Sequence, residues 1–262
     1  MHCLFKIWHS LPTTLRLSII RSVQQNRRVY RWLLFRYIDA KDRANVGRAD
    51  LPPAKLRYRV SSAPDAESFV RVGETCATDI QSTLLKVGRE LKSFDRILDF
   101  GCGCGRTLMH LKGRAPSAQI YGTDIDAGAI AWCRQHLKFA TFDLAEETPP
   151  TKYASDTFDF IYAISVFTHL DENYQFRWLD ELRRITRPGG ILLLTVDSAR
   201  ADGKGFVFER SYERGLFPSW YQNAFHSREY VLANFRSYFD VLGYFPRGMN
   251  NHQDVVVLQK QK

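Results

Sequence analysis

Leu98-Asp99-Phe100-Gly101-Cys102-Gly103-Cys104-Gly105-Arg106 carries three glycines at alternate positions, directly after a short apolar run. Glycine has no Cβ, so a turn of this composition bends sharply and lets a ligand approach its backbone. The free N–H groups at the start of a following helix add hydrogen-bond donors for such a ligand. The stretch therefore predicts a ligand-binding turn between a strand and a helix.

The spacing of the glycines limits the choice of ligand. A dinucleotide fingerprint requires Gly-x-Gly-x-x-Gly, but Arg106 or Leu108 stands where its third glycine is needed. The Gly-Lys-Ser/Thr ending of a phosphate-binding loop is also missing from this turn. Nicotinamide and flavin dinucleotides are therefore disfavoured, as is ATP hydrolysis.

Short β-branched or aromatic runs alternate with helix-sized segments along the chain. This alternation is typical of βαβ units and predicts an α/β protein with a parallel sheet. Pro and Gly at 187–190 are expected to end a helix around 174–186. Two later runs, 239–245 and 254–258, are joined by a turn and predict an antiparallel hairpin at a sheet edge. The expected parallel strands are 96–100, 119–123, 138–142, 158–164 and 190–196.

The glycine turn resembles the first motif of the class I S-adenosylmethionine-dependent methyltransferases, in which an acid precedes Gly-x-Gly-x-Gly. Further segments resemble later motifs of that family, in the same order, over roughly residues 95–197. The resemblance implies a Rossmann-like fold over residues 61–262, with a seven-stranded, mostly parallel sheet whose last strand is antiparallel. It also implies S-adenosylmethionine as the cofactor and transfer of its methyl group as the reaction.

The resemblance assigns a cofactor site residue by residue. Asp124 takes the place of the acid that binds the two ribose hydroxyls, because a carboxylate accepts both of their protons. Asp143 takes the place of the group that meets the adenine amine, although an Asp there also suits the start of a turn. Asp99 is expected near the methionine amine or, alternatively, as a structural acid of the turn. The implied cofactor residues are Asp99, Phe100, Gly101, Cys102, Gly103, Gly105, Asp124, Ile125, Asp143, Leu144 and Ser165.

Three histidines are candidates for a general base. An oxygen or nitrogen acceptor needs such a base where its proton must leave. His169, His226 and His252 are the catalytic candidates. A histidine beside a buried strand is often a hydrogen-bonded structural residue, and this is the alternative for His169.

Residues 197–226 are too long for a simple connection and are rich in aromatic side chains. We interpret them as a lid over the substrate, with a self-packed surface loop as the alternative. Ligands of such sheets lie beyond the carboxyl ends of the parallel strands. Trp220 and Tyr221 of the lid are therefore expected to face the acceptor together with His252 and Gln253.

The segment after the fourth strand bears on the acceptor. Enzymes of this fold that methylate the amino groups of bases generally carry Asn/Asp-Pro-Pro-aromatic there, whereas this chain has Ser165-Val166-Phe167-Thr168. Methylation of a cytosine carbon would need a nucleophilic Pro-Cys pair, and the chain has no Pro-Cys dipeptide. Base methylation by those routes is therefore disfavoured. Residues 250–254, before an apolar run, are similar to bacterial methyltransferases of small metabolites, glycans or lipids, and this resemblance implies an oxygen or nitrogen atom of such a molecule as the acceptor. The alternatives are an RNA methyltransferase and an S-adenosylmethionine-binding protein without catalysis.

Residues 1–60 form a basic extension, with 13 Lys or Arg against three Asp. Residues 14–38 have the periodicity of a helix with one apolar and one basic side. Such a helix is typical of contact with an anionic membrane, and the alternative is a cap packed on the protein's own body. A third reading is recruitment of RNA, which the aromatic residues among the charges support.

The cysteines and apolar runs indicate the compartment. Five cysteines without a Cys-x-x-Cys pair predict reduced thiols, and Cys102 with Cys104 lacks a third ligand for a metal. No apolar run approaches the roughly 20 residues of a membrane-spanning helix, and no secretory signal is recognisable at the N-terminus. We therefore expect no metal site and a cytoplasmic protein, with peripheral membrane contact through the extension.

Overall fold

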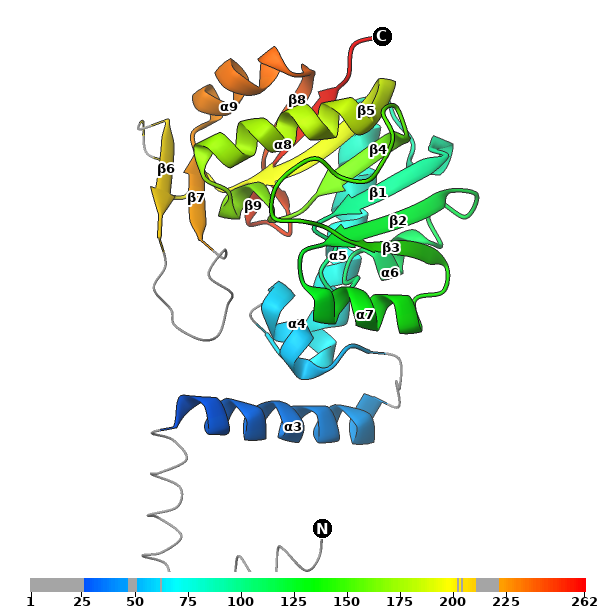
Figure 1. Ribbon diagram of the computed structural model, residues 1–262, viewed down its shortest axis with the longest axis vertical. Coiled ribbons are helices and arrows are strands. Elements are labelled where there is room, and N and C mark those ends of the chain that lie inside the picture. The colour runs from blue at the N-terminus through cyan, green and yellow to red at the C-terminus, as the bar shows by residue number, and fades with distance from the viewer. Residues whose placement is uncertain (1–25, 47–50, 62, 202, 204, 211–221) are drawn as a thin grey trace, which may run out of the picture.

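The computed structural model describes residues 26–46, 51–61, 63–201, 203, 205–210 and 222–262 (Figure 1). Its helices are α3 (Arg27–Val46), α4 (Ala54–Ser61), α5 (Ala66–Lys86), α6 (Leu108–Leu111), α7 (Ala127–His136), α8 (Glu172–Ile185) and α9 (Arg228–Asn234). Its strands are β1 (Arg96–Phe100), β2 (Gln119–Asp124), β3 (Ala140–Leu144), β4 (Phe158–Ala163), β5 (Thr186–Val196), β6 (Phe206–Glu209), β7 (Asn223–His226), β8 (Asp240–Met249) and β9 (Gln253–Gln259).

Seven strands form the central sheet in the order β3-β2-β1-β4-β5-β9-β8. The pairs from β3 to β5 are parallel, whereas β9 runs antiparallel to both β5 and β8. The predicted Rossmann-like sheet with an antiparallel last strand is therefore confirmed. This order brings the carboxyl ends of β1, β2 and β4 to one edge of the sheet, where ligands of such folds bind.

The starts of two strands differ from the sequence prediction by two residues or more. β3 begins at Ala140 instead of residue 138. β5 begins at Thr186, so Pro188 and Gly189 lie inside the strand and not in a separate loop. Pro lacks a donor but is tolerated near a strand start, and Gly189 N donates to Lys260 O across the ladder at 2.8 Å.

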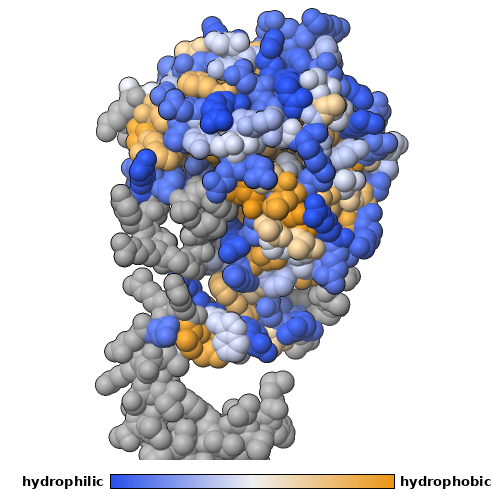
Figure 2. All heavy atoms as spheres, viewed as in Figure 1, coloured by the Kyte–Doolittle hydropathy of each residue, from blue (hydrophilic) through white to orange (hydrophobic). Residues whose placement is uncertain are grey.

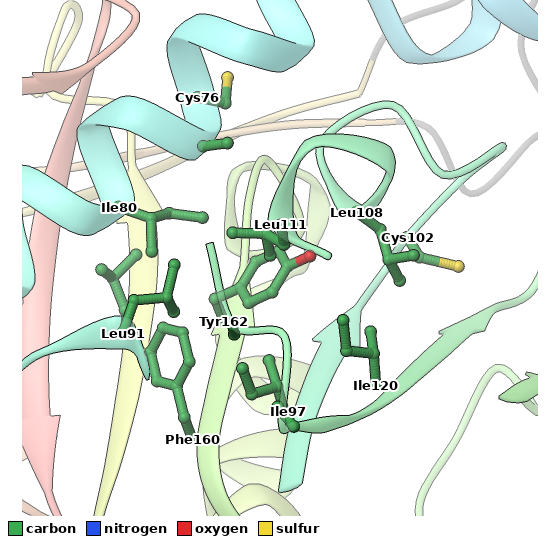
Figure 3. Packing of buried hydrophobic residues seen from close by; sticks show 14 of the residues in the cluster. Cys76, Ile80, Leu91, Ile97, Cys102, Leu108, Leu111, Ile120, Phe160 and Tyr162 are labelled. Atoms are coloured by element: carbon green, nitrogen blue, oxygen red, sulfur yellow. The ribbon is translucent and has the colours of Figure 1, made fainter. Parts of the chain in front are cut away.

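Apolar helix faces cover both sides of the sheet. Side chains of α5 and α6 pack with Ile97, Phe160 and Tyr162 on one face (Figure 3). Side chains of α7 belong to the same cluster. Side chains of α8 and α9 pack with Leu98 and Ile161 on the other face. The strands are buried on both faces, which explains their nearly continuous apolar sequences.

The N-terminal helices differ from the expected single helix at 14–38. Residues 14–25 lie outside the described part of the chain, and α3 continues past residue 38 to Val46. A short helix, α4, follows directly after Pro53, and α5 begins at Ala66 with Asp65 as its N-cap. The Asp65 side chain accepts from Ser68 N at 2.8 Å, which satisfies a free donor of the first turn.

A buried arginine joins α3 to α4. Arg57 is 2% exposed and pairs with Asp39 and Asp42 of α3, while its Nε donates to Pro64 O at 2.7 Å. The rings of Phe35 and Tyr58 add an aromatic contact. The extension is thereby connected to the rest of the molecule through α4.

The interpreted lid contains a second, two-stranded sheet. β6 and β7 pair antiparallel, with Phe206 opposite His226. The 197–226 segment therefore has secondary structure of its own on both sides of residues 211–221. Among the described residues, no helix has the length and apolar character needed to cross a membrane.

Candidate active site

The glycine turn presents bare backbone at the end of β1. Gly101 and Gly103 have φ values of +81° and +52°, which side chains rarely adopt. The N–H groups of Gly101 and Cys102 donate to Thr123 O at 2.8 and 3.0 Å. The turn is therefore fixed to the end of β2, with a strip of backbone left open to a ligand.

Asp124 holds the turn from the neighbouring strand. Its carboxylate accepts from Gly103 N and from Asp126 N, each at 2.7 Å. Burial raises the pKa of this carboxyl, and the backbone donors oppose that change. A buried acid at the end of β2 can accept further protons from a ligand's hydroxyl groups.

Asp99 is the second buried acid of the site. Burial raises its pKa to about 7, the neighbouring Asp124 adds to the rise, and Tyr162 and Arg106 lower it. The Asp99 side chain therefore exists in both protonation states near neutral pH. A cation bound beside it would favour the ionised form.

A cavity of about 360 Å³ lies at this edge of the sheet. Eight of the eleven predicted cofactor residues line it: Asp99, Phe100, Gly101, Cys102, Gly103, Asp124, Ile125 and Ser165. We call it the cofactor cleft. Its wall is mostly apolar, with a few polar groups, as small-molecule sites generally are.

Three predicted cofactor residues are not among those lining the cleft. Gly105 packs under the turn, where a Cβ would lie 2.5 Å from Leu137 Cδ1. Asp143 accepts from Lys152 Nζ and, at 3.0 Å, from Tyr153 Oη, and Leu144 is 49% exposed. The cleft is bounded near this strand end by residues 145–147 instead.

Helix α4 closes the cleft from the N-terminal side, which the sequence did not reveal. Leu56, Arg59 and Val60 line the cavity, and a Cβ on Gly103 would lie 2.4 Å from Val60 Cγ1. Arg106, at the end of the quoted turn, also lines it and has a buried Nε without a hydrogen-bond partner among the described residues. A polar atom of this kind indicates a place for a ligand acceptor.

A second cavity, of about 190 Å³, adjoins the cleft and is mostly polar. We call it the polar cavity. Ser165 and His169 line both cavities, and the predicted His252 and Gln253 line the polar one. Ser165 has φ +57°, and its Oγ donates to Gln253 Oε1 at 2.9 Å. Asp197, just beyond the end of β5, also lines the polar cavity and was missed because nothing distinguishes it in the sequence.

The two buried histidines differ in their surroundings. His169 Nδ1 donates to the carbonyl of Gln222 at 2.5 Å, and burial lowers the pKa of its ring. In the neutral ring this bond places the lone pair on Nε2, the form that can accept a proton. His226 is fully buried with Nε2 2.9 Å from Gln175 Oε1, and burial lowers its pKa to about 3. It is not among the residues that line either cavity.

The 197–226 segment, which we interpret as a lid, borders the cofactor cleft. Trp220 and Tyr221 lie outside the described residues. Phe208 and Gln222, on either side of that gap, line the cofactor cleft. Aromatic content alone pointed to the segment, but not to the side chains that reach the cleft.

Comparison with known families agrees with this geometry. Residues 72–244 match the family model described as "Methyltransferase domain". The chain belongs to the class I S-adenosylmethionine-dependent methyltransferases. The match covers the glycine turn, Asp124 and both cavities except α4 and the β8–β9 turn.

Curated relatives of this methyltransferase act on different acceptors. A trans-aconitate 2-methyltransferase of Delftia acidovorans is 28% identical over 56% of this chain and 54% of its own length. A malonyl-[acyl-carrier protein] O-methyltransferase of Hahella chejuensis is 30% identical over 52% and 50%. A tRNA (carboxymethyluridine(34)-5-O)-methyltransferase of Arabidopsis thaliana is 33% identical over 55% and 36%. The chain spans about half the length of these relatives or less, so their names leave its acceptor class undetermined.

Solved structures support the methyltransferase fold. A SAM-dependent methyltransferase from Aquifex aeolicus has a TM-score of 0.54 and 16% identity, over 80% of this chain and 99% of that one. The PH0226 protein of Pyrococcus horikoshii has a TM-score of 0.53 and 16% identity, over 71% and 90%. At this identity the likeness concerns the fold alone.

The residues of the cleft fit S-adenosylmethionine, the cofactor of this family. Asp124 would hold the ribose hydroxyls, Asp99 would lie near the amine, and the unpartnered Arg106 Nε offers a donor to the carboxylate. Gly101 and Gly103 contribute backbone to the wall of the cleft, in a conformation that side chains rarely adopt.

Proposed function

We propose that this methyltransferase transfers a methyl group to an oxygen or nitrogen atom of a small metabolite, a glycan or a lipid. The observation that carries the proposal is the junction of the two cavities. The cofactor cleft holds the glycine turn, the polar cavity holds hydrogen-bonding groups, and Ser165 and His169 belong to both walls. Val60 of α4 also lines both cavities, so an acceptor in the polar cavity would meet the cleft at these three residues.

The protein's own contribution is binding, orientation and removal of a proton. Bound S-adenosylmethionine supplies an electrophilic methyl group and departs as S-adenosylhomocysteine. His169 is the proposed general base, because its Nδ1–H is held by Gln222 O and its lone pair is on Nε2. Because burial lowers the pKa of His169, its ring stays neutral at pH values below the usual histidine pKa. His169 therefore remains able to accept a proton in mildly acidic solution.

His252 is the alternative base. It lines the polar cavity but is exposed to solvent, and it lines no part of the cofactor cleft. His226 is not retained for this role, because it lines neither cavity and its hydrogen bond to Gln175 supports a structural function.

Positioning is expected to supply much of the rate enhancement. A sulfonium is a good leaving group, so holding the acceptor in line within a site that excludes water lowers the barrier. Helix α4 supports this exclusion through Leu56 and Val60, which lie against the glycine turn and α7.

The test is transfer of labelled methyl from S-adenosylmethionine to cell extracts separated into small-metabolite, glycan, lipid and RNA pools. We expect label in one of the first three pools, and its loss in His169→Gln with unchanged S-adenosylmethionine affinity. His136→Gln, on the exposed end of α7, is the matched control. Label confined to RNA would support the alternative acceptor, and binding without transfer to any pool would support the non-catalytic alternative.

We also propose that the basic extension contacts an anionic membrane surface. Five of the described large apolar residues with high exposure belong to α3, and Figure 2 shows apolar residues among hydrophilic ones along this helix. Arg36, Lys41 and Arg43 are exposed on the same helix. Exposed apolar area beside cations is the combination that interfacial helices use. The apolar residues are Val29, Tyr30, Trp32, Leu33 and Tyr37.

A further inference from the structure

The polar cavity differs from the cofactor cleft in its charges. No Lys or Arg stands among the described residues of its wall, and Asp197 is the single carboxylate there. The remaining polar groups are hydroxyls, amides and imidazoles, including Thr168, Asn223 and Gln253. Neutral groups that both donate and accept are suited to ligand hydroxyls.

A buried hydroxyl in this wall lacks a partner within the protein. Thr168 is 5% exposed and its Oγ1 makes no hydrogen bond among the described residues. Most buried polar atoms are paired, so an exception lining a cavity indicates a group that a ligand satisfies. Thr168 directly precedes His169, so a ligand bound to it would lie next to the proposed base.

Asp197 offers a second anchor. Its Oδ1 accepts from Ala199 N at 2.9 Å, and its backbone O accepts from His226 N at 2.7 Å, so the residue is held in place at the start of the lid. A carboxylate has room for several donors and binds hydroxyl groups through short, charge-assisted bonds. Asp197 and Thr168 therefore form a polar wall with acceptor capacity for a hydroxylated ligand.

The size and apolar part of the wall narrow the class further. A volume of about 190 Å³ is below the range of about 300–1,000 Å³ for whole small-molecule sites, so the cavity suits one ring of a larger acceptor. Phe225 and Ala224 supply an apolar patch against which the C–H face of such a ring can pack.

We propose that the polar cavity binds an uncharged, hydroxylated ring of the acceptor, as in a glycosyl residue, through Thr168 and Asp197. This inference rests on the proposed methyltransferase function and narrows its acceptor class. The reactive hydroxyl then lies at the Ser165–His169 junction. Its oxygen forms the bond to the methyl group, its proton passes to His169, and the sulfur of the cofactor keeps the electrons of the broken bond.

The observations disfavour an anionic acceptor in this cavity. A carboxylate next to Asp197, without a cation among the described wall residues, would be repelled and would lose hydration without compensation. An ammonium would pair with Asp197, but it must lose a proton before it can attack a methyl group. A neutral hydroxyl meets neither obstacle.

The experiment compares acceptors and variants in the full chain. Methyl glycosides of common hexoses and deoxyhexoses, trans-aconitate, simple primary amines and total tRNA are offered with labelled S-adenosylmethionine. Binding of the same probes is followed by saturation-transfer NMR with S-adenosylhomocysteine present. The variants are Thr168→Val and Asp197→Asn, with Thr75→Val on the exposed surface of α5 as the matched control.

We expect at least one glycoside to bind and accept label. Thr168→Val, which removes a hydroxyl without a protein partner, should raise its KM about tenfold or more with little change in kcat, Tm or S-adenosylmethionine affinity. Asp197→Asn should weaken glycoside binding and improve binding of trans-aconitate, since it removes the negative charge. Thr75→Val should change neither KM nor probe binding.

Two results would overturn the inference while leaving the proposed function intact. One is methyl transfer to trans-aconitate, an amine or tRNA but to no glycoside. The other is glycoside binding that neither cavity variant alters. Failure of the protein to bind S-adenosylmethionine at all would instead remove the proposed function itself.

Discussion

Arg59 of α4 forms an ion pair with Asp126, the residue that caps α7 two positions after Asp124. One carboxylate oxygen of Asp126 pairs with the guanidinium, and the other accepts from Gly128 N at 2.9 Å and Ala129 N at 3.2 Å. The two residues are 67 positions apart in the chain. The pair therefore fixes the N-terminal helix over the cofactor cleft, next to the predicted ribose acid.

Arg59→Ala is expected to weaken S-adenosylmethionine binding because α4 loses its charged contact with α7. A partly exposed pair contributes about 1 kcal/mol or less, so the loss should be about fivefold or smaller. Calorimetric titration measures this loss of affinity, with Arg71→Ala on the exposed face of α5 as the control. Equal loss in both variants would show a general charge effect instead of a role for this pair.

Asp124→Ala should lose about 1.5–3 kcal/mol of S-adenosylmethionine binding for each charge-assisted hydrogen bond removed. The substitution also leaves Gly103 N and Asp126 N without their acceptor, so the melting temperature of the ligand-free protein should fall. Asp124→Asn keeps one side-chain oxygen as an acceptor, so we expect a small loss of stability and a larger loss of S-adenosylmethionine affinity. The control is Asp180→Asn on the exposed face of α8. Unchanged binding in Asp124→Ala would exclude Asp124 from the site.

Asp99 predicts a pH dependence of cofactor binding. Its pKa of about 7 falls again when the cationic amine of the cofactor binds, so binding at pH 6 should release a proton. Affinity should fall as pH drops below 7, by up to about tenfold per pH unit. In the free protein the raised pKa costs stability progressively as pH rises from about 4 to about 7.

Calorimetry in buffers of different ionisation enthalpy counts the released protons at pH 6 and pH 8. Asp99→Asn should abolish the proton release and reduce the loss of stability between about pH 4 and pH 7. Proton release that persists in this variant would assign the titration to another group.

Gly103→Ala should destabilise the protein and weaken S-adenosylmethionine binding. The φ of +52° alone costs a side chain about 1–2 kcal/mol, and the new Cβ would meet Val60 Cγ1. The double variant with Val60→Ala should recover the steric part but not the backbone part. Thermal melts separate the two contributions, with Gly113→Ala as a neutral control because no atom lies within 4 Å of its added Cβ. A double variant no better than Gly103→Ala would place Val60 away from the turn in solution.

Liposome flotation tests the proposed membrane contact. The full chain should float with anionic vesicles and not with neutral ones, and less as salt rises. Replacing Tyr30, Leu33 and Tyr37 by Ser should abolish flotation, because these residues are 45%, 44% and 67% exposed on α3. The control replaces Leu85 and Leu242, exposed elsewhere, and should float normally. Flotation of the triple variant would exclude α3 as the apolar contact.

The sequence predicted those parts of the fold that local patterns determine. Apolar runs and glycine spacing gave the sheet, the turn and the position of Asp124, because strand burial and positive φ values are imposed on neighbouring residues. Asp197, Arg59 and Val60 were missed because their roles depend on contacts between distant segments. His169, His226 and His252 look alike in the sequence, and only their hydrogen bonds and the cavities that they line distinguish them.

Arg57 makes the extension part of the balance of charge in the folded protein. Its side chain is almost completely buried, and Asp39 and Asp42 of α3 form ion pairs with its guanidinium. A chain shortened to begin at Leu51 would keep this cation and lose both anions, at a cost that burial makes large. Activity measured on such a shortened chain would not represent the intact protein, because the next turn of the same helix places Val60 against the glycine turn. Asp39 and Asp42 are in this sense counterions for a helix that lines the cofactor cleft.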